Sequence, residues 1–121
     1  MTNKEQGLAC FRNIYKIAVA DGYLVREEKE MLLETGQRMG VSRTQARDIM
    51  HKINHLDFII PDDSNEQLQH LEYIIRMMMV DHEIHDREYE LCYAFAKKIG
   101  RNEVILQRMI DKVSKEMSVL Y

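Results

Sequence analysis

Apolar residues recur along this chain at helical spacing, and the segments that carry this spacing alternate with short polar breaks. One clear example is Ala46, Ile49, Met50 and Ile53, which are spaced i, i+3, i+4 and i+7. Spacing of this kind places the apolar side chains on one face of an α-helix. It predicts helices over about 2–20, 26–39, 42–53, 64–80 and 86–99 and a last helix from 102 onward, with no strands.

The breaks between these segments carry helix start and stop signals. Gly22, Gly40 and Gly100 each follow an apolar segment, and glycine readily adopts the left-handed conformation that ends a helix. Ser42 with Gln45 has the spacing of a capping box, and Asn102 is a candidate cap for the last helix. The helix boundaries are therefore predicted from local chemistry as well as from periodicity.

The chain contains an internal repeat. When it is shifted by 60 positions, residues 14–53 align with residues 74–113 without a gap. A three-helix unit of 40 residues buries too little surface to be stable alone, so the copies should share one core about a pseudo-twofold axis. We predict an all-α, compact helical bundle of two pseudo-symmetric three-helix repeats, six to seven helices in all, forming a single domain over 1–121. Identical pairs include Ile14/Ile74, Asp21/Asp81, Glu28/Glu88, Glu30/Glu90, Gly40/Gly100 and Lys52/Lys112.

Composition narrows the functional classes. The chain has 121 residues, of which 45% are hydrophobic, a proportion typical of a globular domain. Its net charge of −3 argues against a nucleic-acid partner. No apolar run is long enough to span a bilayer, so direct membrane insertion is not expected. Cys10 and Cys92 lack metal or redox spacing and are interpreted as buried free thiols, which favours a cytoplasmic location.

Paired carboxylates are the main candidate chemistry. Each copy has an Asp at a helix end and a Glu seven positions later, in the strings DGYLVREE (21–28) and DHEIHDRE (81–88). Leu24 and Ile84 are expected to anchor these turns in the core. The carboxylates could simply complement free N–H groups and the dipole at the start of the next helix. Alternatively, they form an acidic surface that binds a divalent cation or a basic partner. An EF-hand is excluded, because apolar residues such as Ile17 and Val19 stand where oxygen ligands would be needed.

Histidines extend this candidate site in the second copy. His82 and His85 lie within the second acidic string, and imidazole together with carboxylate suits zinc, nickel or cobalt. A solvated polar loop is the more common explanation of such a string. His51 and His55 are spaced i, i+4 and could share a metal, although the favoured explanation is that they are stabilising cations at a helix C-terminus.

The two acidic strings carry a family resemblance. The stretches IAVADGYLVREEKEMLLETGQRMGVS (17–42) and MMMVDHEIHDREYELCYAFAKKIGRN (77–102) resemble the TerB-like family, which is named for bacterial tellurite-resistance operons. A similar domain forms the N-terminal part of a membrane-anchored DnaJ-like co-chaperone. The resemblance implies an all-helical, internally symmetric fold, a link to metal-stress and envelope-associated responses, and a membrane-associated protein as a candidate partner. Carried over by residue, its candidate metal positions are Asp21, Glu28, Asp81 and Glu88; His82 departs from the Gly22 of the first copy.

Two alternatives remain open beside a non-enzymatic interaction module. The string RMGVSRTQARDIM (38–50) is similar to part of a helix-turn-helix, in which Arg43, Gln45 and Arg47 would face DNA. A metal-dependent enzyme could use the Asp/Glu cluster in acid–base chemistry. No phosphate loop, dinucleotide fingerprint or CxxC motif is present. The sequence therefore favours an interaction module of a bacterial metal- or stress-response pathway, with a divalent cation as its candidate ligand and no enzymatic activity.

Overall fold

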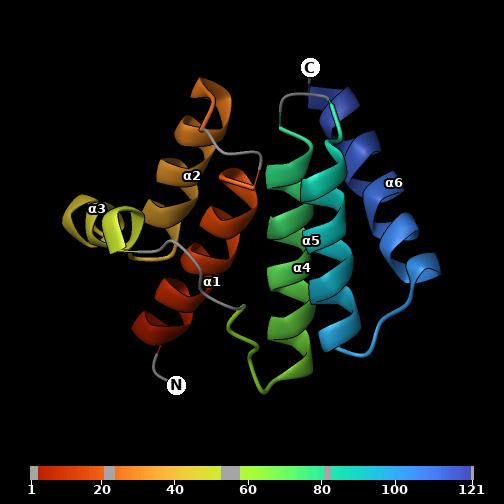
Figure 1. Cartoon of the computed structure of the whole chain (residues 1–121), viewed down its shortest axis with the longest axis horizontal. Coiled ribbons are helices and arrows are strands. Elements are labelled where there is room, and N and C mark those ends of the chain that lie inside the picture. Colours follow the sequence, from red (N-terminus) through yellow and green to blue (C-terminus); the bar gives the residue numbers. More distant parts are fainter. Residues whose placement is uncertain (1–2, 21–23, 53–57, 81–82, 121) are drawn as a thin grey trace.

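The computed structural model describes residues 3–20, 24–52, 58–80 and 83–120 of the chain. Within these ranges it contains six α-helices and no strand, which confirms the all-α prediction (Figure 1). In chain order the helices are α1 (Asn3–Ala18), α2 (Arg26–Arg38), α3 (Arg43–Lys52), α4 (Ser64–Met78), α5 (Asp86–Lys98) and α6 (Glu103–Leu120).

The helices follow the repeat closely. Both bounds of α5 lie 60 positions after those of α2, and α6 begins 60 positions after α3. Contacts between helices show the same symmetry: exchanging α1 with α4, α2 with α5 and α3 with α6 reproduces the set of helix pairs that pack together. The central pair is α1 and α4, and each central helix also contacts α2 and α5. The shared core predicted from the repeat is therefore present.

The turn that ends the second helix of each repeat has the same geometry in both copies. Gly40 has a φ of 79° and Gly100 a φ of 77°, in the left-handed region that glycine adopts most easily. Val41 N–H donates to the Gly36 carbonyl at 2.8 Å, and Arg101 N–H donates to the Ala96 carbonyl at 2.8 Å. Two copies of one local sequence signal thus produce two matching helix ends.

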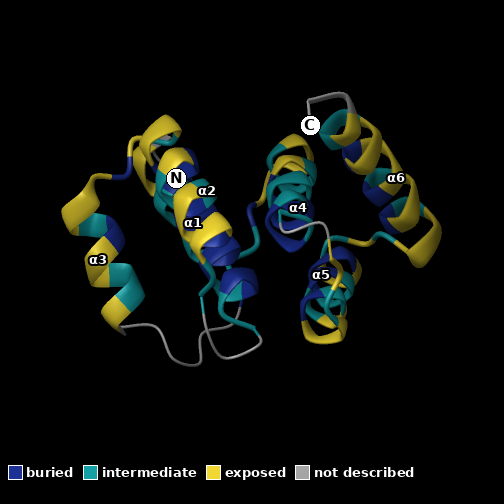
Figure 2. Cartoon of the chain, turned by 90° about the horizontal axis from the view of Figure 1, so that it is seen from above, coloured by how far each residue is buried: buried dark blue, intermediate teal, exposed yellow. Residues whose placement is uncertain are grey.

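The core runs through both halves and across the contact between them, and exposed residues lie on the outer faces of the helices (Figure 2). α1 and α4 contribute most to it, because their stripes face each other as well as the flanking helices. The largest apolar side chains that are completely or almost completely buried are Phe11, Ile14, Ile17, Leu32, Leu71, Ile74, Ile75, Met77, Met78, Phe95 and Leu106.

The described part of the segment that connects the repeats, from Phe58 onward, packs onto the bundle. Phe58 is buried, and its ring meets that of Phe95 edge to face with centroids 5.2 Å apart. Asn13 of α1 holds the next residue: Ile59 N–H donates to Asn13 Oδ1 at 2.9 Å, and Asn13 Nδ2 donates to the Ile59 carbonyl at 2.7 Å. The backbone of Ile59 is thus fixed to α1 by the Asn13 side chain, and Phe58 is fixed to α5 by an aromatic contact.

The residue just before the helix supplies a side-chain cap for α3, α4 and α6. Ser42 and Gln45 form the predicted capping box, with reciprocal bonds of 2.9 and 3.1 Å. Asn102 Oδ1 accepts from Ile105 N–H at 3.0 Å, as predicted. Asp63 caps α4 by accepting from Glu66 N–H at 3.0 Å, a contact that the periodicity did not single out.

The cap at Asn102 gives a direct test of these local signals. Replacing Asn102 with Ala removes the acceptor for Ile105 N–H, and the expected loss is about 1 kcal/mol in the free energy of unfolding. Asn102→Asp should retain most of the stability, since its carboxylate accepts the same bond. Urea denaturation of both variants measures the difference; equal stability of the two would contradict the cap.

Candidate functional site at the acidic end

The described parts of the two acidic strings, 24–28 and 83–88, lie at one end of the bundle. α1 and α4 end there, and α2 and α5 begin there, at the top of Figure 1. A contact between the repeats joins the two corners: Arg87 Nη1, in the first turn of α5, donates to the carbonyl of Ala20 at 3.4 Å. The fold therefore gathers the two candidate segments, which are 60 positions apart in the sequence.

Glu28 is the third residue of α2 and lies inside the protein, with 3% of its surface exposed. Its Oε1 accepts from the backbone N–H of Val25, the residue before the helix, at 3.2 Å. A carboxylate in this position satisfies a donor that would otherwise lack a partner, and it complements the positive end of the helix dipole. The contact matches the first of the two interpretations of this residue, a structural cap.

Glu88 occupies the equivalent position in α5 and is 1% exposed. The residue before the helix is His85, whose Nε2 lies 3.9 Å from Glu88 Oε1. Burial raises the pKa of the Cys92 thiol well above its usual value, and the negative charge of Glu88 adds to this effect. The Glu88 carboxylate oxygens are therefore buried, and their charge acts on a thiol one turn further along the helix.

Asp21, Asp81 and His82 lie outside the described residues. Within the parts of the chain that are described, no group of three or more His, Cys, Asp or Glu side chains is placed to hold a metal ion.

Ile84 differs from its prediction: it is 47% exposed, whereas its counterpart Leu24 is half-buried against the core. Ile84 is therefore not anchored in the core as Leu24 is.

Two other motifs predicted from the sequence are the His51/His55 pair and the helix-turn-helix string 38–50. His51 is exposed on α3, and its predicted companion His55 lies outside the described residues. In the helix-turn-helix string, Arg43 and Arg47 are exposed, but the Gln45 side chain is held in the cap of its own helix. One of the three side chains proposed to read DNA thus has a structural role.

Sequence reasoning missed one residue with unusual surroundings, Arg101. Its Nε atom is buried and, among the described residues, has no hydrogen-bond partner. The repeat alignment contains the signal for this residue, because the equivalent position in the first copy is Val41, which is 4% exposed. A buried apolar position in one copy is thus a cation in the other.

Comparisons of the chain with protein-family models, with curated proteins and with solved structures found no match. In the described part of the chain, none of the helices combines the length and the apolar composition needed to cross a membrane.

Proposed function

We propose that this protein is a TerB-like, non-enzymatic interaction module of a bacterial metal- or stress-response pathway, and that its acidic end binds a divalent cation. The observation that carries the proposal is the placement of Glu28 and Glu88 at equivalent positions of α2 and α5, at one end of the bundle. The preceding acids of each string, Asp21 and Asp81, are the residues that would present carboxylate oxygens to the ion.

The surroundings of the two glutamates favour binding over catalysis. The Glu28 carboxylate is bonded to the Val25 backbone, and Glu88 is almost completely buried. A general acid or base must reach the proton of a substrate, and neither buried group is presented in that way. The proposed role of these residues is to fix the turns that carry the aspartates, while a protein partner, for which a membrane-associated protein is the candidate, contacts this end.

Calorimetric titration with Ca²⁺, Mn²⁺ and Zn²⁺ tests the cation site. The wild-type chain should bind one of these ions with measurable heat, and the double variant Asp21→Asn/Asp81→Asn should lose it. Glu34→Gln/Asp48→Asn is the matched control, because it removes the same two charges from exposed positions on α2 and α3. Equal heats from both double variants would mean that the ions only screen the acidic surface, and the cation site would then be abandoned.

A further inference from the structure

A groove lies between α4 and α6, on the second repeat. Its volume is about 620 Å³, within the range typical of sites for small molecules. The apolar part of its lining is formed by Leu68 of α4 and by Ile105, Met109 and Val113 of α6. This groove is separate from the acidic end, because none of the residues that line it belongs to either acidic string.

A positively charged side chain, that of Arg101, lies at one end of the groove. Arg101 stands immediately before the cap of α6 and lines the groove, and its Nε is buried without a partner in the described part of the chain. Burying a polar group without a hydrogen bond is costly, and more so for a charged group. The first repeat avoids this cost, because Val41 fills the same place on an equivalent turn. Arg101 therefore has one buried donor without a partner, at a position where the first repeat has a buried apolar side chain.

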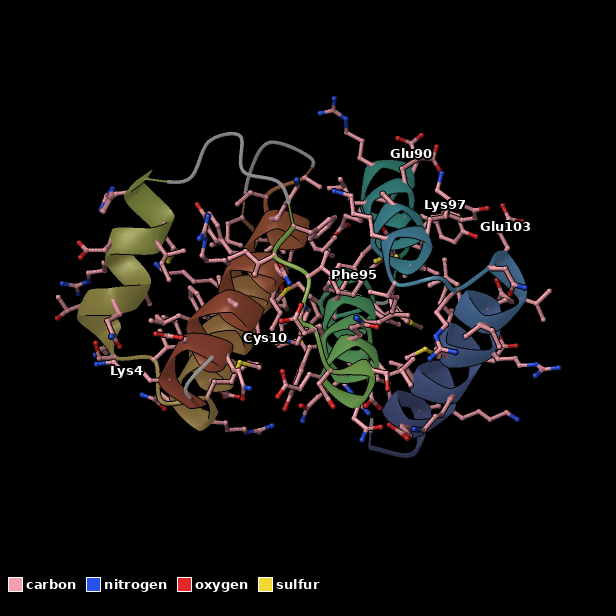
Figure 3. The ribbon with its side chains drawn as sticks, turned by 90° about the horizontal axis from the view of Figure 1, so that it is seen from below. Lys4, Cys10, Glu90, Phe95, Lys97 and Glu103 are labelled. Atoms are coloured by element: carbon pink, nitrogen blue, oxygen red, sulfur yellow. The ribbon has the colours of Figure 1, made fainter. Side chains whose placement is uncertain are left out.

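The nearby carboxylates do not neutralise Arg101. Glu66 lines the same end from α4, but no ion pair joins it to Arg101, although the structure describes both residues. Glu103, two residues further on, interacts instead with the Tyr93 hydroxyl; loss of solvent around that hydroxyl raises the pKa of Tyr93, and Glu103 adds to this effect. Figure 3 shows this end of the bundle, with Glu103 labelled on the first turn of α6. The guanidinium therefore remains available to an anion from outside.

The opposite end of the groove is bridged by ion pairs. Lys112 Nζ lies 3.6 Å from Glu72 Oε1, and Arg76, which pairs with Glu72 at 3.2 Å, also pairs with Glu116 of α6. These bonds tie α4 to α6 across the groove. A partner helix, about 10–12 Å in diameter, would have to break this bridge to lie along the whole groove. A narrow occupant would not, so the bridge favours a small molecule over a docked helix.

We propose that the groove binds a small amphiphilic carboxylate. Its anionic head pairs with Arg101, and its apolar body lies on Leu68, Ile105 and Met109. Arginine presents paired N–H donors that match the two oxygens of a carboxylate. The second cation, Lys112, is already paired with Glu72, so a ligand with one negative charge fits the groove better than a dianion.

Titration of the full chain with laurate, below its micelle concentration, tests the proposal. We expect one molecule bound per chain, with chemical shift changes at the methyl groups of Leu68, Ile105 and Met109. Arg101→Gln should weaken binding at least about tenfold, since it removes a charge-assisted pair. Arg108→Gln is the matched control, because it removes an exposed arginine from α6 that does not line the groove, and it should leave the affinity unchanged.

Arg101→Val separates binding from folding. It restores the residue of the first repeat, so the variant should unfold at a higher temperature than wild type and should not bind laurate. The proposal is overturned if laurate does not bind, if the Arg101 variants bind as well as wild type, if dodecanol binds as tightly as laurate, or if the shift changes fall outside the groove. Destabilisation by Arg101→Val would also overturn it, because the arginine would then serve the fold itself.

Discussion

Acidification from pH 7 to pH 4 is expected to destabilise this protein through one buried histidine, His70. Its side chain is 3% exposed, and burial lowers its pKa from 6.5 to about 4. An unfolded chain binds a proton at this residue below about pH 6.5, whereas the folded protein does not until about pH 4. Because the unfolded state binds more protons in this window, stability falls as the pH is lowered through it, by about 3 kcal/mol in total.

The contacts of His70 explain why the neutral ring is retained. Asn13 Nδ2 lies 3.0 Å from His70 Nδ1, and the orientation of the Asn13 amide is fixed by its two bonds to the backbone of Ile59. With Nδ2 facing the ring, Nδ1 must act as an acceptor, which requires the neutral form with its proton on Nε2. Protonation of Nδ1 would place a donor against a donor, next to the Phe95 ring that stacks on the imidazole.

The measurement is urea denaturation at several pH values between 4 and 7, for wild type and for His70→Gln. The variant should be less stable at pH 7, because glutamine replaces the packed ring. It should also lose less stability than wild type on acidification, since the titrating group is absent. Carboxylates contribute equally to both proteins, so the difference between the two curves isolates His70. Parallel curves would show that this histidine titrates alike in the folded and unfolded states.

Gly7→Ala is expected to destabilise the protein by about 2 kcal/mol, the scale of overpacking a buried site. Gly7 lies within α1, where helix propensity alone predicts that alanine stabilises by about 1 kcal/mol. A Cβ at this position would lie 2.4 Å from the carbonyl oxygen of Met39, at the end of α2. That oxygen belongs to the backbone, so relief requires the two helices to move apart. The sign of the effect therefore distinguishes packing from propensity.

Gly36→Ala provides the comparison for this experiment. Gly36 is also a buried helix glycine, but its Cβ would meet the ring of Phe11 at 3.0 Å, and a side chain can adjust more easily than a backbone. We expect a smaller loss of stability than for Gly7→Ala, measured by urea denaturation of both variants at pH 7. Stabilisation by Gly7→Ala would show that α1 and α2 are farther apart than the structure places them.

Much of the fold could be predicted from local sequence. Gly40 and Gly100 end helices, and Ser42 and Asn102 begin them, because each acts on backbone groups within a few residues of itself. The apolar stripes gave the faces of the helices for the same reason, since helical periodicity is a property of the nearest turns. The repeat at an offset of 60 then indicated that the two sets of three helices share one core.

Only the tertiary structure decided the surroundings of individual polar and small residues. Glu28 and Glu88 could have faced solvent at a helix start, but packing of the repeats buries both. Ile84 and Leu24 occupy equivalent positions, yet one is exposed and the other half-buried. The pairing of Asn13 with His70 and the approach of Met39 to Gly7 join residues far apart in the chain. Sequence periodicity tells which face of a helix is buried, but what lies against that face depends on how distant segments pack, and this is what sets the charge, pKa and tolerance of each site.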